Sequence, residues 1–592
     1  MKILGLATMG SSAAALIEDG EVVFAAEEER FSRIKNDGSF PLKAIAGLLE
    51  QQKITLNDID LICVYWERNK VMHRAINILR LLATNPGKAR SKIDRLKNVL
   101  LWSGQKELNQ TQNQGSWREL FFVKSILRKE FGKFGADVCF LNHHACHVAS
   151  AIDFSGFGEA LILSYDGGGE SLSTLLLHQK DGVSTELLTE KWPNSLGHFY
   201  SFFTGYLGFR MLEDEYKLMG LASLGKPVYR DALNAQVLRP KGGSQYKINT
   251  KIADYHEALA GRFNKDLNEI FGPPRRQGEV ITDTHKNIAA SVQVVFEESV
   301  LKLVQVGLDR YPHINKLCIV GGCALNVAAN GKILTSSAIR NIFVPPAPHD
   351  AGCAIGAGII GYRKLTGSRS AVVMSDAFLG QQFSNTEVRR VIEKTGFTCP
   401  GVIEEGTLLK LIAEELASGA VVAWYQGRAE FGPRALGHRS ILADPRNKNI
   451  QALMNQKIKK RELFRPFAPS VKEEKAIEYF DLNQSSPYMN IVANVRSEMR
   501  DVIPAVTHVD NTARVHTVTR EVNPRYWSLL HEFEKITGVP VLLNTSFNIQ
   551  EPIVNTPGEA ISTFLRSEID ILVLNDFLFD ATWRENNKIE NT

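Results

Sequence analysis

Two apolar segments that run directly into glycines constrain the fold of this chain more than any other feature. Residues 161–165 (LILSY) precede Asp166 and three glycines, and residues 317–320 (LCIV) precede Gly321 and Gly322. An apolar run of this length bounded by glycine is typical of a buried strand in an α/β sheet. In open α/β folds the chemistry lies beyond the carboxyl ends of the strands, where glycine lets the backbone approach a phosphate or a ribose. The pattern therefore predicts an α/β fold with functional loops at these two strand ends.

Residues 142–152 suggest a metal-binding helix. His143 and His147 are four residues apart, and an apolar stripe in the same segment predicts a helix on which both imidazoles share one face. Histidines at this spacing are more often packed or solvated than metal-bound. Asp166 and Asp350, each at a predicted strand end, complete a set of two imidazoles and two carboxylates. Such a set suits a divalent transition metal.

Size and composition exclude several classes of protein. With 592 residues the chain is too long for one core, and about two to four domains are expected. A net charge of +4 gives no support to nucleic-acid binding. No segment reaches the ~18 apolar residues of a membrane span. The seven cysteines form no C-x-x-C pair, which favours reduced thiols and a cytoplasmic enzyme.

Two further segments of the first half yield predictions. Residues 2–8 and 21–26 are predicted to be paired strands joined by a turn of small residues at 10–14. The glycine and serines of that turn leave backbone N–H groups free to approach a phosphate or a carbonyl; a tight turn at a sheet edge is an equal alternative. Residues 68–133 are basic and predicted to be mostly helical.

A second α/β unit is predicted after a connector at residues 365–404. Residues 421–425 read as a strand, and residues 427–440 then interleave glycine, proline and arginine. Arginines on glycine-marked turns suit bidentate capture of phosphate or carboxylate, and a salt-bridged surface is the alternative. Residues 542–548 add amide and hydroxyl donors at another strand end.

Taken together, the motifs resemble those of the NodU/CmcH family of O-carbamoyltransferases along nearly the whole chain. The matching segments are residues 26–31 (AEEERF), 143–147 (HHACH), 215–221 (EYKLMGL), 431–437 (FGPRALG), 465–469 (RPFAP) and 544–548 (NTSFN). The resemblance implies an α/β protein with an actin/Hsp70-like (ASKHA) metal domain at residues 1–364. It also implies a connector at 365–404, followed by a YrdC-like α/β domain at 405–592. This second domain would form carbamoyl-adenylate.

The resemblance also implies a reaction and its residues. Carbamoyl phosphate and ATP, the latter with Mg²⁺, would form carbamoyl-adenylate, whose carbamoyl group passes to a hydroxyl or an amine of a small natural product or sugar. A divalent metal, Fe(II) by resemblance, would be held by His143, His147, Asp166 and Asp350. The adenylate would contact Gly321, Gly322 and Asn326. Carbamoyl phosphate and ATP would be bound by Arg434, Arg439, Lys457, Arg465, Arg514, Asn544 and Ser546.

The chain departs from the family pattern in its first hairpin. Relatives usually carry His-Asp where this sequence has Gly10-Ser11, and that histidine is the family's candidate general base. Either another group substitutes, or an acceptor such as an amine needs no strong base, or transfer is impaired. His349, beside Asp350, is the candidate catalytic substitute, and a packed histidine is the alternative. Asn36 also stands where relatives often have histidine.

Three functions remain open at this stage. The first is an ATP-dependent O-carbamoyltransferase with a small-molecule acceptor, without nucleic acid or membrane as a partner and with a homodimer as one assembly. The second is an actin-like sugar kinase, which the arginine-rich second unit disfavours. The third is a non-catalytic relative that binds nucleotide and metal, which the departure at Gly10 favours.

Overall fold

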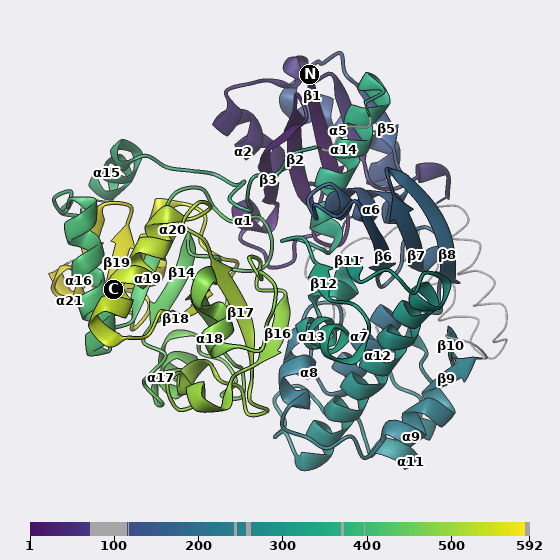
Figure 1. The fold of residues 1–592 in the computed structure, drawn as a ribbon. Helices are drawn as coiled ribbons and strands as arrows, with labels where there is room; N and C mark the ends of the chain where they lie inside the picture. The colour runs from purple at the N-terminus through teal and green to yellow at the C-terminus, as the bar shows by residue number, and fades with distance from the viewer. Residues whose placement is uncertain are drawn as a thin grey trace. The chain divides into compact units, whose positions relative to one another are not determined.

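A computed structural model describes residues 1–70, 115, 118–241, 245–255, 258, 262–368, 372–395 and 397–586. The chain forms two compact units, Met1–Met374 and Ser375–Thr592. Each unit is α/β, as the sequence predicts (Figure 1). The predicted boundaries at 364 and 404 stay a prediction. Of the basic segment at 68–133, residues 71–114 and 116–117 lie outside the described residues, and helix α5 (Glu119–Phe131) follows them.

The first unit begins with a five-stranded sheet in the order β3-β2-β1-β4-β5. Strands β1 to β3 form an antiparallel meander, and β4 and β5 continue the sheet parallel to β1. The bounds are β1 (Lys2–Ala7), β2 (Ala13–Glu18), β3 (Glu21–Glu27), β4 (Leu61–Val64) and β5 (Asp137–Phe140). The predicted pairing of residues 2–8 with 21–26 is therefore wrong, because the apolar residues Ala13 to Ile17 form a buried strand between them.

A second five-stranded sheet, in the order β12-β11-β6-β7-β8, repeats this plan. Strands β6, β7 and β8 are antiparallel neighbours, and β11 and β12 extend the sheet parallel to β6. Their bounds are β6 (Glu159–Tyr165), β7 (Leu172–Lys180), β8 (Val183–Lys191), β11 (Lys316–Val320) and β12 (Asn341–Phe343). The two strands that the glycine pattern predicts, β6 and β11, are confirmed and lie side by side. The unit thus contains one topology twice.

Helices α6 (His143–Ile152) and α14 (Cys353–Thr366) pack against each other, and α14 also packs on β1. Glycines permit this close packing. A Cβ at Gly356 would collide with the Cys146 carbonyl on α6, and one at Gly5 would collide with the Ala354 carbonyl on α14. Any larger residue at either position would force the helices or the strand apart.

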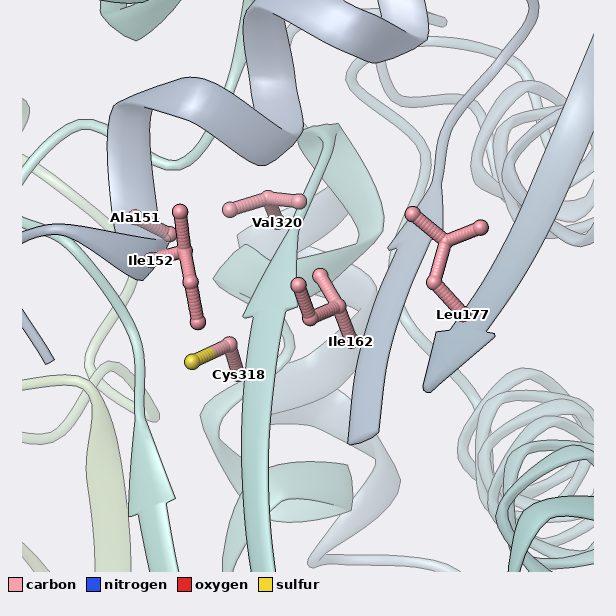
Figure 2. Close-up of a cluster of buried hydrophobic side chains, with 6 residues drawn as sticks. All are labelled: Ala151, Ile152, Ile162, Leu177, Cys318 and Val320. Carbon is pink, nitrogen blue, oxygen red and sulfur yellow. The ribbon is translucent and has the colours of Figure 1, made fainter. Parts of the chain in front are cut away.

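An apolar cluster fixes α6 on the second sheet. Figure 2 shows Ala151 and Ile152 of α6 beside Ile162 of β6 and Cys318 and Val320 of β11, with Leu177 of β7 at the far side. All six side chains are at most 9 % exposed. Burying one isoleucine stabilises the fold by about 1.5–3 kcal/mol. This packing holds the helix that carries the two histidines against the strand that ends at Asp166.

The other helices of the first unit connect and cover these sheets. Long helix α12 (Asp283–Arg310) packs against α7, α8 and α13, and a small hairpin joins β9 to β10. The bounds are α1 (Glu29–Ser32), α2 (Leu42–Gln52), α7 (Leu196–Tyr206), α8 (Glu215–Ala222), α9 (Arg230–Ala232), β9 (Leu238–Lys241), β10 (Gln245–Ile248), α11 (Asp266–Phe271) and α13 (Val327–Ser336). Within the described residues, no helix is long and apolar enough to span a bilayer.

The second unit is built on one mixed eight-stranded sheet in the order β16-β17-β15-β18-β14-β13-β19-β20. The strands are β13 (Val422–Tyr425), β14 (Arg439–Ala443), β15 (Ala468–Lys472), β16 (Ile491–Asn494), β17 (Thr512–Val518), β18 (Val541–Ser546), β19 (Ile571–Leu574) and β20 (Phe577–Phe579). The helices are α15 (Asn385–Lys394), α16 (Glu405–Ser418), α17 (Ile450–Leu453), α18 (Ala476–Tyr479), α19 (Pro524–Thr537), α20 (Pro557–Leu565) and α21 (Ala581–Asn586). The predicted strands at 421–425 and from 542 correspond to β13 and β18.

Candidate functional sites

Helix α6 presents His143 and His147 from its first turns. The side chain of its N-cap residue, Asn142, accepts the Ala145 N–H at 3.0 Å and so satisfies a donor that the first turn leaves unpaired. The two imidazoles are only 1 % and 0 % exposed. Their Nε2 atoms lie 3.2 Å apart. The four-residue spacing therefore brings two ring nitrogens to one buried point.

Two carboxylates face these imidazoles. Asp166 follows β6, and its Oδ2 lies 3.0 Å from His147 Nε2 and 3.5 Å from His143 Nε2. Asp350 begins the 3-10 helix η5 (Asp350–Gly352), and its Oδ1 lies 3.7 Å from His147 Nε2 and 3.9 Å from His143 Nε2. One ligand atom from each residue lies within 4.8 Å of the other three. The structure thus brings together all four residues that the sequence analysis singles out as metal ligands.

The two carboxylates are oriented by partners outside this cluster. Asp166 Oδ1 accepts the Gly167 N–H at 2.6 Å, and Asp350 Oδ2 accepts the Tyr65 hydroxyl at 3.2 Å. In each carboxylate, the other oxygen faces the histidines. Ligand bonds of about 2.0–2.2 Å in a tetrahedral site would separate the donor atoms by about 3.3–3.6 Å. The observed separations from 3.0 to 3.9 Å bracket that value. The residues therefore fit a divalent metal ion.

The charges of the cluster agree with this fit. Burial alone would lower the pKa of His147, but the hydrogen bonds and charges of Asp166 and Asp350 outweigh burial and raise that pKa to about 9. Burial would raise the pKa of Asp166, yet the two imidazoles hold it well below its usual value. The Asp166 carboxylate thus offers negative charge to the centre of the cluster, where a divalent cation would be stabilised.

Glu170, which the sequence analysis does not identify, fixes the start of α6. Its side chain is buried, and Oε1 accepts the backbone N–H groups of His143 at 3.1 Å and Glu67 at 2.9 Å. Asn142 Nδ2 lies 3.3 Å from Oε2. A carboxylate at a helix N-terminus is favoured by the helix dipole. The available signal in the sequence is an acid directly after the Gly167–Gly169 run.

His144 has a different role from its two neighbours. Its Nδ1 lies 2.8 Å from Ser164 Oγ, and its Nε2 lies 3.2 Å from the Leu172 carbonyl. Burial lowers the pKa of His144 to about 3, with the neighbouring histidines adding to the effect. The ring is therefore neutral and ties α6 to β6 and to the start of β7.

Gly10, at which the first hairpin departs from the family pattern, lies directly beside the histidine–aspartate cluster. Gly10 has a φ of 69°, and a Cβ there would collide with Asp350 Oδ2. His349 precedes the same ligand; burial lowers its pKa, and its buried Nδ1 has no hydrogen-bond partner among the described residues. The structure therefore places His349 next to the cluster as a neutral imidazole, and its role as a general base stays a prediction.

The second glycine loop adjoins the same cluster. Gly321 has a φ of 94°, and a Cβ there would collide with the Tyr165 carbonyl, so the loop requires glycine. A Cβ at Gly322 would lie 3.0 Å from Asp166 Oδ1. The Asn326 side chain caps α13 and exchanges hydrogen bonds of 3.0 and 3.1 Å with Gln293. Its amide is therefore engaged within the protein, and its contact with an adenylate stays a prediction.

Four arginines gather in the second unit. Burial, with a smaller contribution from the charge of Arg465, lowers the pKa of Arg434 to about 10. Burial and the charges of Arg434, Arg461 and Arg465 hold the pKa of Arg514 well below its usual value. Among the described residues neither Arg434 nor Arg514 has a carboxylate partner, and the Nε atom of each is buried without a hydrogen bond. Buried guanidinium groups without counter-charges suit a bound anion. The sequence analysis did not select Arg461.

The loop that carries Arg434 is shaped by Glu430 and Arg439. Glu430 Oε1 accepts the backbone N–H groups of Leu436, His438 and Arg439 at 2.8, 2.9 and 3.0 Å. The fully buried Arg439 stacks 3.6 Å from the ring centroid of Tyr425, and its terminal nitrogens donate to backbone carbonyls. Through these contacts Arg439 supports the loop. Its binding of carbamoyl phosphate or ATP stays a prediction.

Two lysines close in sequence differ in environment. Lys457 is about half-exposed and pairs with Glu568 at 3.2 Å. Lys459 is buried, and its Nζ lies 2.8 Å from the carbonyl oxygens of both Ser546 and Asn548. Lys459 is therefore the lysine in contact with the predicted binding residue Ser546. The sequence analysis chose Lys457, for which the contacts give no support.

Asn544, two residues before Ser546, takes part in a buried polar network. Its Nδ2 donates to Ser470 Oγ at 2.9 Å, and that hydroxyl lies 2.7 Å from His516 Nδ1. The Oδ1 of Asn544 is buried without a partner among the described residues. An unsatisfied buried acceptor of this kind would favour a donor from a ligand.

Comparison with known proteins identifies both units. Residues 2–359 match the family model described as carbamoyltransferase N-terminus, and residues 413–581 match carbamoyltransferase C-terminus. The full-length HypF structure has a TM-score of 0.31 at 12% identity, over 62% of this chain and 47% of that chain. A likeness that distant carries no argument.

Two similar relatives extend along nearly all of this chain. Uncharacterized protein sll1178 of Synechocystis sp. is 40% identical, over 98% of this chain and 97% of its own length. Nodulation protein NolNO of Sinorhizobium fredii is 37% identical, over 96% of this chain and 79% of its own length. The chain is therefore a transferase enzyme that belongs to the carbamoyltransferase family.

Proposed function

We propose that this protein is an ATP-dependent O-carbamoyltransferase that works through carbamoyl-adenylate. Carbamoyl phosphate and ATP would react in the second unit, and the carbamoyl group would then pass to an acceptor hydroxyl or amine at the histidine–aspartate cluster of the first. The observation that carries the proposal is the convergence of His143, His147, Asp166 and Asp350 within 4.8 Å. Family membership supports carbamoyl transfer in general.

The doubled five-stranded topology of the first unit supports an actin/Hsp70-like metal domain, because that fold consists of two copies of one such sheet. The single mixed sheet of the second unit, with its buried arginines, is compatible with a YrdC-like domain. These two assignments, and the expected boundaries at 364 and 404, are part of the proposal.

In the second unit, Arg434, Arg465 and Arg514 would bind the phosphates of carbamoyl phosphate and ATP. Mass balance requires that carbamoyl phosphate, ATP and water give carbamoyl-adenylate, pyrophosphate and phosphate. Water first cleaves the bond between the carbamoyl group and the phosphate, and phosphate leaves. An oxygen of the resulting carbamate then attacks the α-phosphorus of ATP, and pyrophosphate leaves. Guanidinium groups held in a water-poor site stabilise the charge that develops on these oxygens without first having to reorganise. Lys459, Asn544 and Ser546 would complete the site, and Mg²⁺ could accompany ATP.

In the first unit, the two imidazoles and two carboxylates would hold a divalent ion, Fe(II) in our proposal. When bound there, the ion would supply Lewis-acid polarisation of the carbamoyl carbonyl. Gly321 and Gly322 would contact the adenylate, and among the described residues, chain neighbours aside, only Asp166 lies within 4 Å of a Cβ built at Gly322. The acceptor loses one proton when it takes the carbamoyl group. His349, a neutral imidazole next to Asp350 in the sequence, would receive that proton. Adenylate leaves as a stable anion.

The decisive experiment measures pyrophosphate release from ATP as a function of carbamoyl phosphate. The proposal predicts release by the wild-type protein and by Lys535→Met, which alters an exposed surface lysine, but not by Arg514→Met. Metal content measured by mass spectrometry should fall in Asp350→Asn but not in His313→Ala, an exposed histidine outside the cluster. Release that ignores carbamoyl phosphate, or a protein that binds no divalent ion, would overturn the proposal.

We also propose that the acceptor is a small molecule and that neither nucleic acid nor a membrane is a partner. The net charge of +4 gives no support to a nucleic-acid partner. The described cysteines are all free thiols, which supports a cytoplasmic location. A homodimer is compatible with the proposal. His349→Ala assayed with an acceptor tests the general base: unchanged transfer would eliminate His349.

A further inference from the structure

Two cysteines face each other across neighbouring strands of the first sheet. Cys63 on β4 and Cys139 on β5 are direct partners in the parallel register, and their Sγ atoms lie 3.1 Å apart. Both are free thiols. Among the described residues, β5 is the outer strand at this edge of the sheet, with a neighbouring strand on one side only.

The two thiols are chemically unequal. Cys63 is fully buried, whereas Cys139 is partly exposed. The hydrogen bond from Cys63 lowers the pKa of Cys139, and although burial opposes this, Lys364 lowers it further. The same hydrogen bond and burial raise the pKa of Cys63. The thiolate, which is the reactive form, is therefore favoured on the sulfur that solvent can reach.

Both strands lead directly into the metal-binding cluster. Two residues beyond Cys63, the Tyr65 hydroxyl hydrogen-bonds to Asp350 Oδ2 at 3.2 Å. Three and four residues beyond Cys139 come Asn142, which caps α6, and His143. A movement of β5 relative to β4 would therefore be transmitted to a ligand and to the helix cap that positions it.

We propose that Cys63 and Cys139 are a redox modification site, at which a peroxide converts the thiol pair to a disulfide and thereby disturbs the histidine–aspartate cluster. The Cys139 thiolate attacks one peroxide oxygen and becomes a sulfenic acid, and hydroxide leaves. Cys63 sulfur then attacks the sulfenic sulfur and loses its proton, and water leaves. Overall, two thiols and hydrogen peroxide give one disulfide and two waters. A dithiol reductant reverses the change by thiol–disulfide exchange.

The geometry determines which strand moves. A disulfide bond is about 2.05 Å long, so the sulfurs must approach by roughly 1 Å. Cys63 is fully buried, and its Sγ packs against Gly361 so tightly that a Cβ there would overlap it. We therefore expect strand β5, the outer strand among the described residues, to move more than β4. Its displacement would shift Asn142 and His143 relative to Asp166 and Asp350.

The test treats the full-length protein with hydrogen peroxide, quenches free thiols with an alkylating reagent and maps the peptides by mass spectrometry. We expect a peptide pair linked through Cys63 and Cys139, lost after dithiothreitol, in the wild type and in Cys399→Ser. That control removes a partly exposed thiol of the other unit. Cys139→Ser and Cys63→Ala should show no such pair. Absence of the linked pair in the wild type would overturn the proposal.

The proposed effect of the disulfide on the histidine–aspartate cluster rests on the proposed metal site, so a separate measurement of metal affinity tests it. Co²⁺ added to the metal-free protein serves as the probe, because its visible absorption reports bound ion. We expect peroxide to weaken Co²⁺ binding at least tenfold and reversibly in the wild type, but not in Cys139→Ser. A linked pair with unchanged Co²⁺ affinity would refute the coupling. A reduced wild type that binds no Co²⁺ would refute the metal site instead and leave the disulfide standing.

Discussion

Replacing Glu170 by alanine should weaken metal binding beyond what the loss of stability explains. The buried carboxylate accepts the backbone N–H groups of His143 and Glu67, and its removal leaves both without that partner. Hydrogen bonds to charged groups contribute about 1.5–3 kcal/mol each, so the free energy of unfolding should fall by about 3–6 kcal/mol. Because one of these donors belongs to a ligand residue, the dissociation constant for metal should rise about tenfold to a hundredfold.

Glu28 provides a matched control for this prediction. It is buried too, and its two oxygens accept the N–H groups of Lys43 and Ala44, at 3.2 and 2.7 Å, in the first turn of α2. Glu28→Ala therefore removes an equivalent pair of hydrogen bonds away from the ligands. Urea unfolding measures stability, and titration with Co²⁺ measures affinity. We expect similar losses of stability in the two variants and a loss of affinity only in Glu170→Ala; equal Co²⁺ affinities in the two would refute the reasoning.

Three further predictions concern stability. Ile162→Ala should lower the free energy of unfolding by about 2–5 kcal/mol in urea titrations, because it empties part of a closed cluster, whereas Val183→Ala at an exposed position should change it by less than about 0.5 kcal/mol. Burial lowers the pKa of His516 to about 3, whereas an unfolded histidine has a pKa of about 6.5, so below that pH the unfolded state binds more protons than the folded state. The contribution of His516 to the free energy of unfolding should therefore fall by about 2 kcal/mol from pH 6.5 to 5, and His516→Gln should flatten that dependence on pH. Arg514→Met relieves repulsion among buried guanidinium groups, so it should raise the free energy of unfolding by about 1–4 kcal/mol and abolish carbamoyl-phosphate-dependent pyrophosphate release. A free energy of unfolding below that of the wild type would contradict the expected relief of repulsion.

The histidine–aspartate cluster could be anticipated because its residues carry local signals. His143 and His147 are linked by helical periodicity, and Asp166 is marked by the strand and glycines around it. These patterns depend on only a few neighbouring residues, so they survive without knowledge of the tertiary fold. Glu170 carries only one local signal, its position directly after the Gly167–Gly169 run, and that signal does not indicate a role. Its importance comes from two backbone donors far apart in sequence, which only the folded chain brings to one carboxylate.

Lys457 and Lys459 show why a local pattern alone does not determine where a side chain lies. Residues Met454–Ile458 form a π-helical turn rather than a continued α-helix. A π turn adds a residue to the helical turn and changes the direction of every side chain after it. Lys459, just beyond the turn, points to Ser546 and Asn548, whereas Lys457 reaches the surface. Both lysines carry the same charge and lie two residues apart in one basic segment, so no local pattern distinguishes their environments.

The repeated topology explains why the cluster forms where it does. Strand β5 is the fifth strand of the first sheet, and β12 occupies the same place in the second. His143 follows β5 at the start of α6, and Asp350 follows β12 shortly before α14. The equivalent ends of two similar halves thus supply a histidine and an aspartate. The two helices that follow pack together through Gly356 and Cys146.

The same correspondence relates the remaining loops. The loop after β1 contains Gly10, and the equivalent loop after β6 begins with Asp166. One half therefore contributes a carboxylate at this position, whereas the other contributes a glycine that lets Asp350 approach, because a Cβ at Gly10 would overlap Asp350. After the fourth strands, Tyr65 in one half orients Asp350, and Gly321 in the other packs closely against the backbone of Tyr165. Equivalent loops thus carry unequal residues, so the two halves do not contribute alike to the histidine–aspartate cluster.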